Sequence, residues 1–99
     1  MHLSALQRYI LQTTVLIGRK KVSRQIFHRF YHSAATPSRT LQINAITKSL
    51  ERLIAKKLVI GFGELTACKW FIKEIQLTAL GRNLAKDLLG QQITLPLKK

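Results

Sequence analysis

Apolar residues recur at helical spacing in the middle of the chain, over residues 43–58 (INAITKSLERLIAKKL). At about 100° per residue, the larger apolar residues fall within one arc of a helix: Ile43, Ile46, Leu50, Leu53, Ile54 and Leu58. The opposite arc holds Asn44, Ala45, Lys48, Arg52 and Ala55. The pattern predicts an amphipathic helix whose outer side carries an amide, two cations and small residues.

Cap residues and apolar spacing predict three further helices. Ser4 and Gln7 form a capping-box pattern that opens a helix over residues 4–17, which Gly18 ends. Ser23 caps a second helix over residues 24–34, with a buried side of Ile26, Phe27, Phe30, Tyr31 and Ala34. Thr78 caps a last helix over residues 79–89, which stops at Gly90 and buries Leu80, Leu84 and Leu88.

Two strands are predicted between the third and the last helix. Residues 58–64 have apolar side chains at positions 58, 60 and 62, and residues 70–77 place Phe71, Ile75 and Leu77 on one face. Residues 65–69 connect the strands as a hairpin loop. The element order is helix, an optional short strand, helix, helix, strand, strand, helix, which defines an α+β fold.

Residues 35–41 (ATPSRTL) separate the second helix from the third. Pro37 stops the second helix, and Ser38 and Thr40 are turn or cap residues. Two helices joined by a polar turn, the second with a basic side, have the form of a helix-turn-helix. The hairpin that follows then has the position of a wing.

The length of 99 residues predicts one domain with a short C-terminal tail over about residues 90–99. The tail carries Ile93, Leu95 and Leu97, which are exposed unless something covers them. We expect a homodimer formed through the first helix, the last helix and the tail. The alternative is a tail that folds back on its own subunit.

The chain carries 17 Lys and Arg residues against four acids, a formal net charge of +13, and residues 1–50 contain no acid. Such an excess in a small domain indicates a polyanionic partner, most often nucleic acid, with an anionic membrane surface as the rival. No apolar run reaches the roughly 18 residues needed to span a bilayer. The N-terminus does not read as a signal peptide. Cys68 is the only cysteine. We therefore expect a cytoplasmic, nucleoid-associated protein.

The outer side of the third helix carries side chains suited to DNA. Asn44 can pair with an adenine edge, and Lys48 and Arg52 can pair with guanine or phosphate. We predict that Gln42 joins them, and that cations elsewhere hold the DNA backbone: Arg39, Arg24, Arg19, Lys20 and Lys21. In the hairpin, Lys69 and Lys73 can contact phosphate or the minor groove. The alternative for each cation is a solvated surface.

Catalytic and metal chemistry have few candidates in this composition. With four acids in all, neither paired carboxylates nor a nucleophile–base pair can be assembled, so we expect no enzyme activity and no cofactor. His28 and His32 are four residues apart, but a structural zinc site normally takes four ligands, and no nearby Cys/His pair completes one. We expect no metal site and interpret both histidines as exposed helix residues.

Three segments carry a resemblance to a known family: residues 3–11 (LSALQRYIL), residues 46–53 (ITKSLERL) leading to residues 57–60 (KLVI), and residues 77–82 (LTALGR). In this order and spacing the chain resembles winged helix-turn-helix regulators of the MarR/PadR type over nearly its whole length. Lys57 stands where these regulators usually have Gly. The resemblance implies DNA binding with the third helix in the major groove and the wing beside it.

These features together predict sequence-specific binding of double-stranded DNA by a small transcriptional regulator. The alternative is a winged-helix protein–protein interaction module in a nucleic-acid-associated complex, with the Trp70 hairpin and the apolar tail as docking surfaces. RNA binding is disfavoured because the chain lacks a paired aromatic stacking platform.

Overall fold

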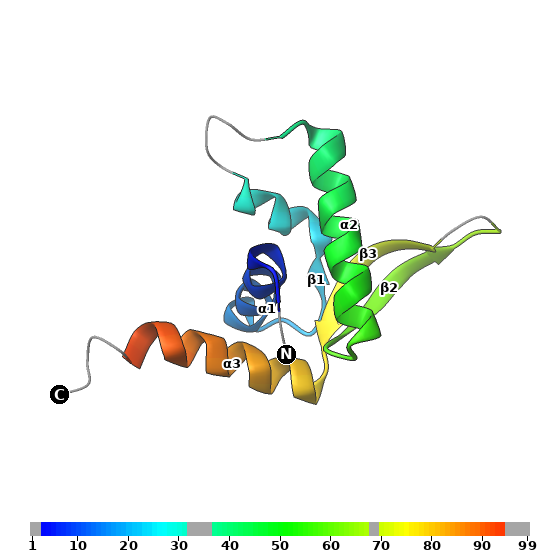
Figure 1. The fold of residues 1–99 in the computed structure, drawn as a ribbon. Helices are drawn as coiled ribbons and strands as arrows, with labels where there is room; N and C mark the ends of the chain where they lie inside the picture. Colours follow the sequence, from blue (N-terminus) through cyan, green and yellow to red (C-terminus); the bar gives the residue numbers. More distant parts are fainter. Residues whose placement is uncertain (1–2, 32–36, 68–69, 95–99) are drawn as a thin grey trace.

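The computed structural model describes residues 3–31, 37–67 and 70–94 of the chain. Its elements are, in order, α1 (Ala5–Ile17), β1 (Val22–Ser23), the 3-10 helix η1 (Arg24–Phe30), α2 (Arg39–Ala55), β2 (Val59–Leu65), β3 (Trp70–Leu77) and α3 (Ala79–Thr94). Figure 1 shows the β2–β3 hairpin projecting from the body beside α2. This arrangement confirms the predicted α+β winged-helix order, including the short strand between the first two helices.

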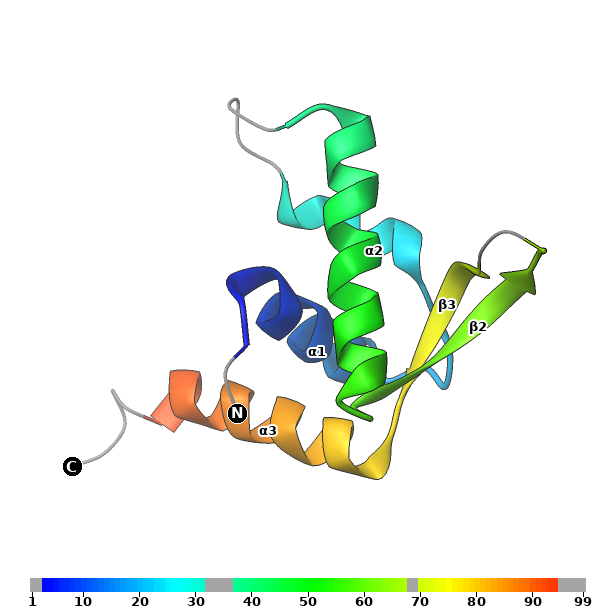
Figure 2. The same cartoon turned by 45° about the vertical axis from the view of Figure 1, so that its right-hand side comes forward.

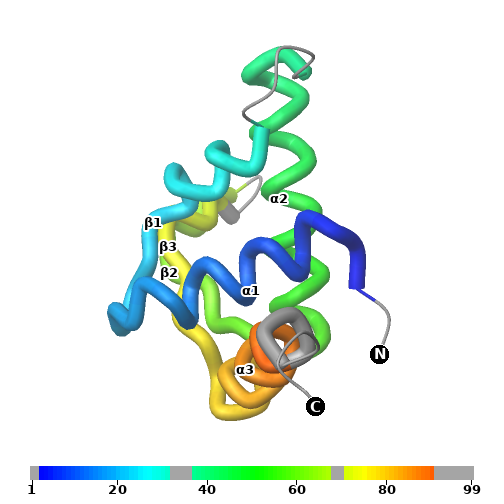
Figure 3. The backbone as a smooth tube through the Cα atoms, turned by 90° about the vertical axis from the view of Figure 1, so that its left-hand side faces the viewer, coloured from blue at the N-terminus to red at the C-terminus, as the bar shows by residue number. Residues whose placement is uncertain are grey.

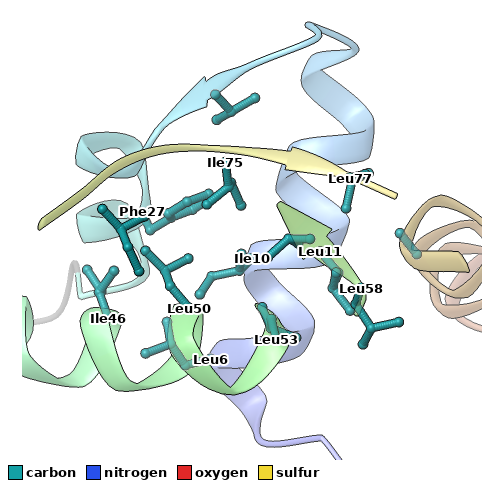
Figure 4. Close-up of a cluster of buried hydrophobic side chains, with 14 of the residues drawn as sticks. Leu6, Ile10, Leu11, Phe27, Ile46, Leu50, Leu53, Leu58, Ile75 and Leu77 are labelled. Carbon is teal, nitrogen blue, oxygen red and sulfur yellow. The ribbon is translucent and has the colours of Figure 1, made fainter. Parts of the chain in front are cut away.

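The core forms where α1, α2, η1 and the inner face of the sheet meet. Figure 4 shows the large buried side chains of these elements pointing toward one another, among them Ile10, Phe27, Leu50 and Ile75. Each of these four is fully buried. Because the burial of apolar area drives folding, the core fixes how α2 and the hairpin sit relative to α1.

Both predicted ends of α1 are confirmed by its cap geometry. The hydroxyl of Ser4 accepts a hydrogen bond from the backbone N–H of Gln7 (3.2 Å), and Oε1 of Gln7 accepts one from the N–H of Ser4 (3.1 Å). At the other end Gly18 adopts a left-handed φ of 73°, which glycine adopts without a steric penalty. The chain therefore turns sharply before β1.

The second helix is shorter and tighter than predicted. Ser23 caps it as expected, accepting from the N–H of Gln25 at 3.2 Å, but η1 is a 3-10 helix that ends at Phe30. The N–H of Tyr31 donates to the carbonyl of His28, three residues back. Phe27 is fully buried and anchors this short helix in the core. Residues 32–34 of the predicted helix lie outside the described residues.

α2 begins earlier and ends earlier than the prediction of residues 43–58. Its N-cap is Ser38, whose hydroxyl accepts from the N–H of Leu41 at 3.3 Å. It ends at Ala55 because Lys57 takes a left-handed φ of 64°. The N–H groups of Lys57 and Leu58 close the end by donating to Ile54 and Leu53. Lys57 thus adopts a conformation that glycine adopts more easily, at the position where the regulators that the sequence resembles usually have Gly.

The three strands form one antiparallel sheet of order β1-β3-β2. The register shifts between Phe62 and Gly63, which pair with Glu74 and Ile72, so Lys73 is the extra residue of a β-bulge. The bulge turns Ile72 into the core and leaves Phe71 45% exposed, so the predicted shared face of Phe71, Ile75 and Leu77 is wrong. The prediction for β2 is also wrong, because Val59 is buried while Ile60 is 46% exposed.

α3 starts where predicted but does not stop at Gly90; it runs to Thr94. Oγ1 of Thr78 accepts from the N–H of Gly81 at 3.0 Å and donates to the carbonyl of Lys57 at 2.8 Å. Gly90 lacks the positive φ of a C-cap, so the helix continues through it. Within α3, Leu80 is 54% exposed instead of buried. Residues 95–99 of the predicted tail lie outside the described residues.

Candidate nucleic-acid interface

The outer face of α2 carries three of the predicted contact residues. Asn44, Lys48 and Arg52 are all exposed. They occur at intervals of four residues, so they form one stripe along the helix. The opposite face is buried and includes Ile46, Ser49, Leu50 and Leu53. Figure 2 shows α2 at the front of the molecule with the hairpin beside its lower end. A ligand that lies along α2 would therefore have the hairpin as a neighbour.

Gln42 does not belong to this outer stripe, which corrects the prediction that it contacts DNA. Only 8% of the residue is exposed. Its Nε2 donates to the carbonyl of Pro37 at 3.0 Å, and its Oε1 lies 2.8 Å from Nδ1 of His28. Because α2 begins at Arg39, position 42 falls in helical phase with Ile46 on the buried side. The amide of Gln42 instead links α2 to His28 of η1 and to Pro37, just before the helix begins.

Ile43 marks the edge of the predicted apolar arc and is 43% exposed. Ser49 replaces it on the buried side, so the packed face of α2 is rotated relative to the prediction. The exposed surface of α2 includes two polar residues that the prediction left out, Thr40 and Glu51. Glu51 lies three residues after Lys48 within the predicted helix, so its spacing was already visible in the sequence. Thr40 lies four residues before Asn44 and joins this surface only because α2 begins at Arg39.

Arg24 was predicted to hold the DNA backbone, but its guanidinium is occupied within the protein. Nη2 donates to the carbonyl of Ile43 (3.0 Å) and to Oγ1 of Thr47 (2.7 Å), while Nη1 donates to the carbonyl of Ile72 (3.2 Å). Desolvation by burial lowers the pKa of Arg24 below its usual value. The residue therefore ties α2 to β3, a structural role that corrects the prediction.

Arg39 is exposed at the first turn of α2, as the prediction requires. Its Nη2 donates to Oε1 of Gln25 at 3.2 Å, which orients the side chain between η1 and α2. An exposed hydrogen bond of this kind contributes little and exchanges readily with water or phosphate. Arg39 therefore remains available to a phosphate at the N-terminal end of α2.

Of the two hairpin cations predicted to contact DNA, the structure describes Lys73 but not Lys69. Nζ of Lys73 forms an ion pair with Oε1 of Glu64 at 3.0 Å, with both side chains mostly exposed. Such surface pairs are worth about 0–1 kcal/mol, so a phosphate can compete for the amine. Lys69 and the neighbouring Cys68 lie outside the described residues. The described part of the wing offers one cation, already paired with an acid.

The three cations of the connector between α1 and β1, residues 19–21, lie in two different environments. Nζ of Lys21 lies 4.2 Å above the centre of the Phe62 ring, a cation–π contact on the outer face of the sheet. Arg19 and Lys20 line a cavity between α1, β3 and α3, together with Arg82 and Lys86. Neither Arg82 nor Lys86 is among the contact residues predicted from the sequence. Their only signal was the four-residue spacing that puts them on one side of a helix.

The interpretation of His28 as an exposed residue is wrong, because only 9% of it is exposed and Gln42 faces its ring. His32 lies outside the described residues. Within residues 3–31, 37–67 and 70–94, no group of three or more His, Cys, Asp or Glu side chains is placed to hold a metal ion. The same residues include no helix that is long and apolar enough to cross a membrane.

Comparison with known proteins identifies similarity in structure but not in sequence. No protein-family model and no curated sequence matches the chain. The fold is similar to AdcR, the adhesin competence repressor of Streptococcus pyogenes, with a TM-score of 0.59 and 18% identity over 96% of this chain. It is also similar to a mutant of ZitR from Lactococcus lactis, with a TM-score of 0.64 and 18% identity over 98% of this chain.

The chain spans 62% of the length of the AdcR chain and 58% of that of the ZitR chain. At this level of identity the similarity concerns the fold. It agrees with the element order, the cap geometry and the three-stranded sheet described above. The chain therefore has the winged-helix fold, with α2 at the recognition-helix position and β2–β3 as the wing.

Proposed function

We propose that this protein binds double-stranded DNA sequence-specifically and acts as a small, non-catalytic transcriptional regulator. The observation that carries the proposal is the exposed stripe of Asn44, Lys48 and Arg52 on α2. The major groove admits an α-helix, and these three side chain types pair with base edges and phosphates there. The net charge of +13 supports the same partner. Similarity to a repressor fold is consistent with it.

In the proposed complex α2 lies in the major groove and the wing lies on the flanking backbone or minor groove. Arg39 holds a phosphate near the start of α2, and Lys73 exchanges Glu64 for a phosphate. Lys69 is a further candidate for backbone contact. We leave Gln42 and Arg24 out because their polar atoms are engaged in the protein. Arg19 and Lys20 are also left out, because they face the cavity by α3.

The direct test is the double substitution Lys48→Gln/Arg52→Gln, measured by fluorescence anisotropy on a labelled duplex at about 0.1 M salt. Both side chains are exposed and Gln has a similar helix propensity, so thermal stability should change little. We expect affinity to fall at least tenfold, because one lost bidentate base contact costs about 1–3 kcal/mol.

The matched control is Arg82→Gln/Lys86→Gln, which removes the same charge from α3, on exposed residues outside the proposed interface. We expect this control to bind the duplex nearly as the wild type does. An equal loss in both variants would mean that binding follows net charge alone. An unchanged affinity in the Lys48 and Arg52 variant would reject α2 as the contact surface.

We also propose that the protein acts as a homodimer through α1, α3 and the C-terminal tail. Exposed apolar residues on these helices support the proposal: Leu16 and Ile17 at the end of α1 and Leu80 on α3. Figure 1 shows the second half of α3 extending past α1. Sedimentation measures the dimer directly. Selection from a random duplex pool should return a palindrome with half-sites about ten base pairs apart.

The wing gives a second candidate function, protein–protein contact. Leu65 at its tip is 81% exposed, and Ile60 and Phe71 are also exposed along the hairpin. Apolar groups of this size suit a protein surface better than a phosphate backbone. This function would be favoured if Leu65→Ser left duplex affinity unchanged while a defined protein co-purified with the wild type and was lost from the variant.

A further inference from the structure

A cavity of about 430 Å³ lies where the end of α1, the connector after it, the end of β3 and the first turns of α3 meet. Its lining contains four cations: Arg19, Lys20, Arg82 and Lys86. The other lining residues carry no charge; they include Thr14 and the half-buried Gln76. The cavity is therefore bounded by positive charge without an acid in its wall.

Specific local structure brings these cations together from distant parts of the sequence. The left-handed turn at Gly18 reverses the chain after α1 and directs the following two residues to the cavity. Arg82 and Lys86 are one helical turn apart on α3. The start of α3 is fixed by the cap at Thr78 and by the close packing of Gly81 on the Leu58 backbone. The positions of the four cations are thus set by the turn at Gly18 and by the fixed start of α3.

Among the residues that the structure describes, no acid forms an ion pair with any of these four cations. The ion pair between Lys73 and Glu64 involves none of them and lies in the wing. Like charges around one cavity repel each other and create a local positive potential. A bound anion would relieve this repulsion and would be attracted by the same potential.

The cluster lies apart from the face assigned to DNA. Figure 3 shows the connector of residues 18–21 on one side of the body and α2 on the other. A duplex lying along the outer stripe of α2 would leave the cavity open to solvent on the opposite side. The cations of the cavity could therefore bind a separate ligand while a duplex lies on α2.

We propose that this cavity binds a small multivalent oxyanion of the phosphate class, such as pyrophosphate or a phosphorylated metabolite. Its volume is within the usual range for small-molecule sites, about 300–1,000 Å³. Arg19 and Arg82 offer planar guanidinium groups that bind oxyanions bidentately, and Lys20 and Lys86 add point charges. The amide of Gln76 supplies a neutral donor. This site goes beyond the proposed DNA binding and does not depend on it.

The test is isothermal titration of the intact protein with pyrophosphate at low salt, with acetate as the monovalent comparison. We expect saturable pyrophosphate binding, and weakening by at least about tenfold in Arg82→Gln/Lys86→Gln, because charge-assisted bonds to the anion are lost. A second variant, Arg19→Gln/Lys20→Gln, should weaken binding similarly. Lys48→Gln/Arg52→Gln removes the same charge from α2 and should bind pyrophosphate like the wild type.

Binding should also appear at the site itself, as changes in the amide NMR signals of Gly18 and Gln76 on addition of pyrophosphate. Equal weakening in the cavity variants and in the α2 variant would mean general charge attraction and would overturn the proposal. So would acetate binding as tightly as pyrophosphate. Loss of duplex affinity in the cavity variants without any pyrophosphate binding in the wild type would assign the cluster to the DNA backbone instead.

Discussion

Nη2 of Arg24 donates to Oγ1 of Thr47 at 2.7 Å, so a residue at the start of η1 holds the middle of α2. The same guanidinium reaches the carbonyl of Ile72 in β3 at 3.2 Å. One side chain thus joins α2 to the wing. In a DNA-binding winged helix these two elements must keep a fixed relation, because they would contact successive parts of the duplex.

We predict that Arg24→Lys lowers both stability and duplex affinity. A single ammonium cannot reproduce the fork of donors that reaches α2 and β3 together. Hydrogen bonds to charged groups contribute about 1.5–3 kcal/mol, and partial exposure of the residue places the expected loss at the lower end. Urea unfolding measures the loss of stability, and anisotropy measures the affinity of the folded protein.

Thr47→Val is the control for the Arg24 experiment, since it removes one acceptor and keeps the shape of the side chain. Its cost should be smaller, about 1 kcal/mol. If Arg24→Lys leaves both stability and affinity at wild-type values, the proposed link between α2 and the wing has no energetic role.

Gln42→Leu should destabilise the protein by about 1–3 kcal/mol, because it leaves the carbonyl of Pro37 and Nδ1 of His28 without their partner in a buried site. Since Nε2 of Gln42 donates to Pro37, Oε1 is the acceptor and His28 carries the proton on Nδ1. Thermal unfolding measures the loss. Below the transition the folded variant should bind DNA with wild-type affinity, whereas a role of Gln42 in base contact requires that affinity to fall.

The contrast between Gln42 and Asn44 explains how far the sequence determines the site. The apolar period of residues 46–54 fixes the phase of α2 and correctly places Asn44, Lys48 and Arg52 outside. The start of the helix depends on the hydroxyl of Ser38, which lies in the segment of residues 35–41 that the sequence predicts to separate two helices. An error of four residues in the start left Gln42 outside the predicted helix, where its phase could not be assigned.

The strands show a different limit of sequence interpretation. A strict two-residue alternation predicted that Phe71 and Ile75 share a face, but one bulged residue, Lys73, inverts the alternation between them. Nothing in the local pattern marks the bulge, because it arises from pairing with β2. The cavity by α3 is equally non-local: it joins residues 14–20 to residues 76–86, and no periodicity within either segment indicates their contact.

Gly81 and Gly90 provide a matched pair within α3. A Cβ at Gly81 would lie 1.9 Å from the carbonyl oxygen of Leu58, which is backbone and cannot move aside, whereas a Cβ at Gly90 meets nothing within 4 Å. We predict that Gly81→Ala costs at least 1–3 kcal/mol, about the usual range for overpacking. Gly90→Ala should instead stabilise the protein by about 0.5–1 kcal/mol, because alanine favours the helix.

Urea unfolding of the two alanine variants measures this difference directly. Equal effects of the two substitutions would show that α3 does not pack on the Leu58 backbone as described. That result would also remove the fixed start of α3 on which the convergence of Arg82 and Lys86 depends.

Lys57→Gly should stabilise the protein by about 1 kcal/mol. Lys57 has a φ of 64°, and a residue with a Cβ in this left-handed region carries a penalty of about 1–2 kcal/mol, part of which is offset by the larger unfolded-state freedom of glycine. Lys56→Gly is the control, because Lys56 has an ordinary right-handed φ of −82° and should lose stability. Stabilisation by both substitutions would contradict the conformational explanation.

The salt dependence of DNA binding should separate base contacts from phosphate contacts on α2. Each phosphate that a cation neutralises contributes about −0.9 to the slope of log affinity against log salt concentration. Asn44 has no charge, so Asn44→Ala should reduce discrimination at one base pair by about 1–3 kcal/mol and leave the slope unchanged. Arg39→Gln, which removes a cation assigned to phosphate, should reduce the slope by about 0.9 and weaken all sequences equally. A changed slope in Asn44→Ala, or a loss confined to one sequence in Arg39→Gln, would exchange the roles assigned to the two residues.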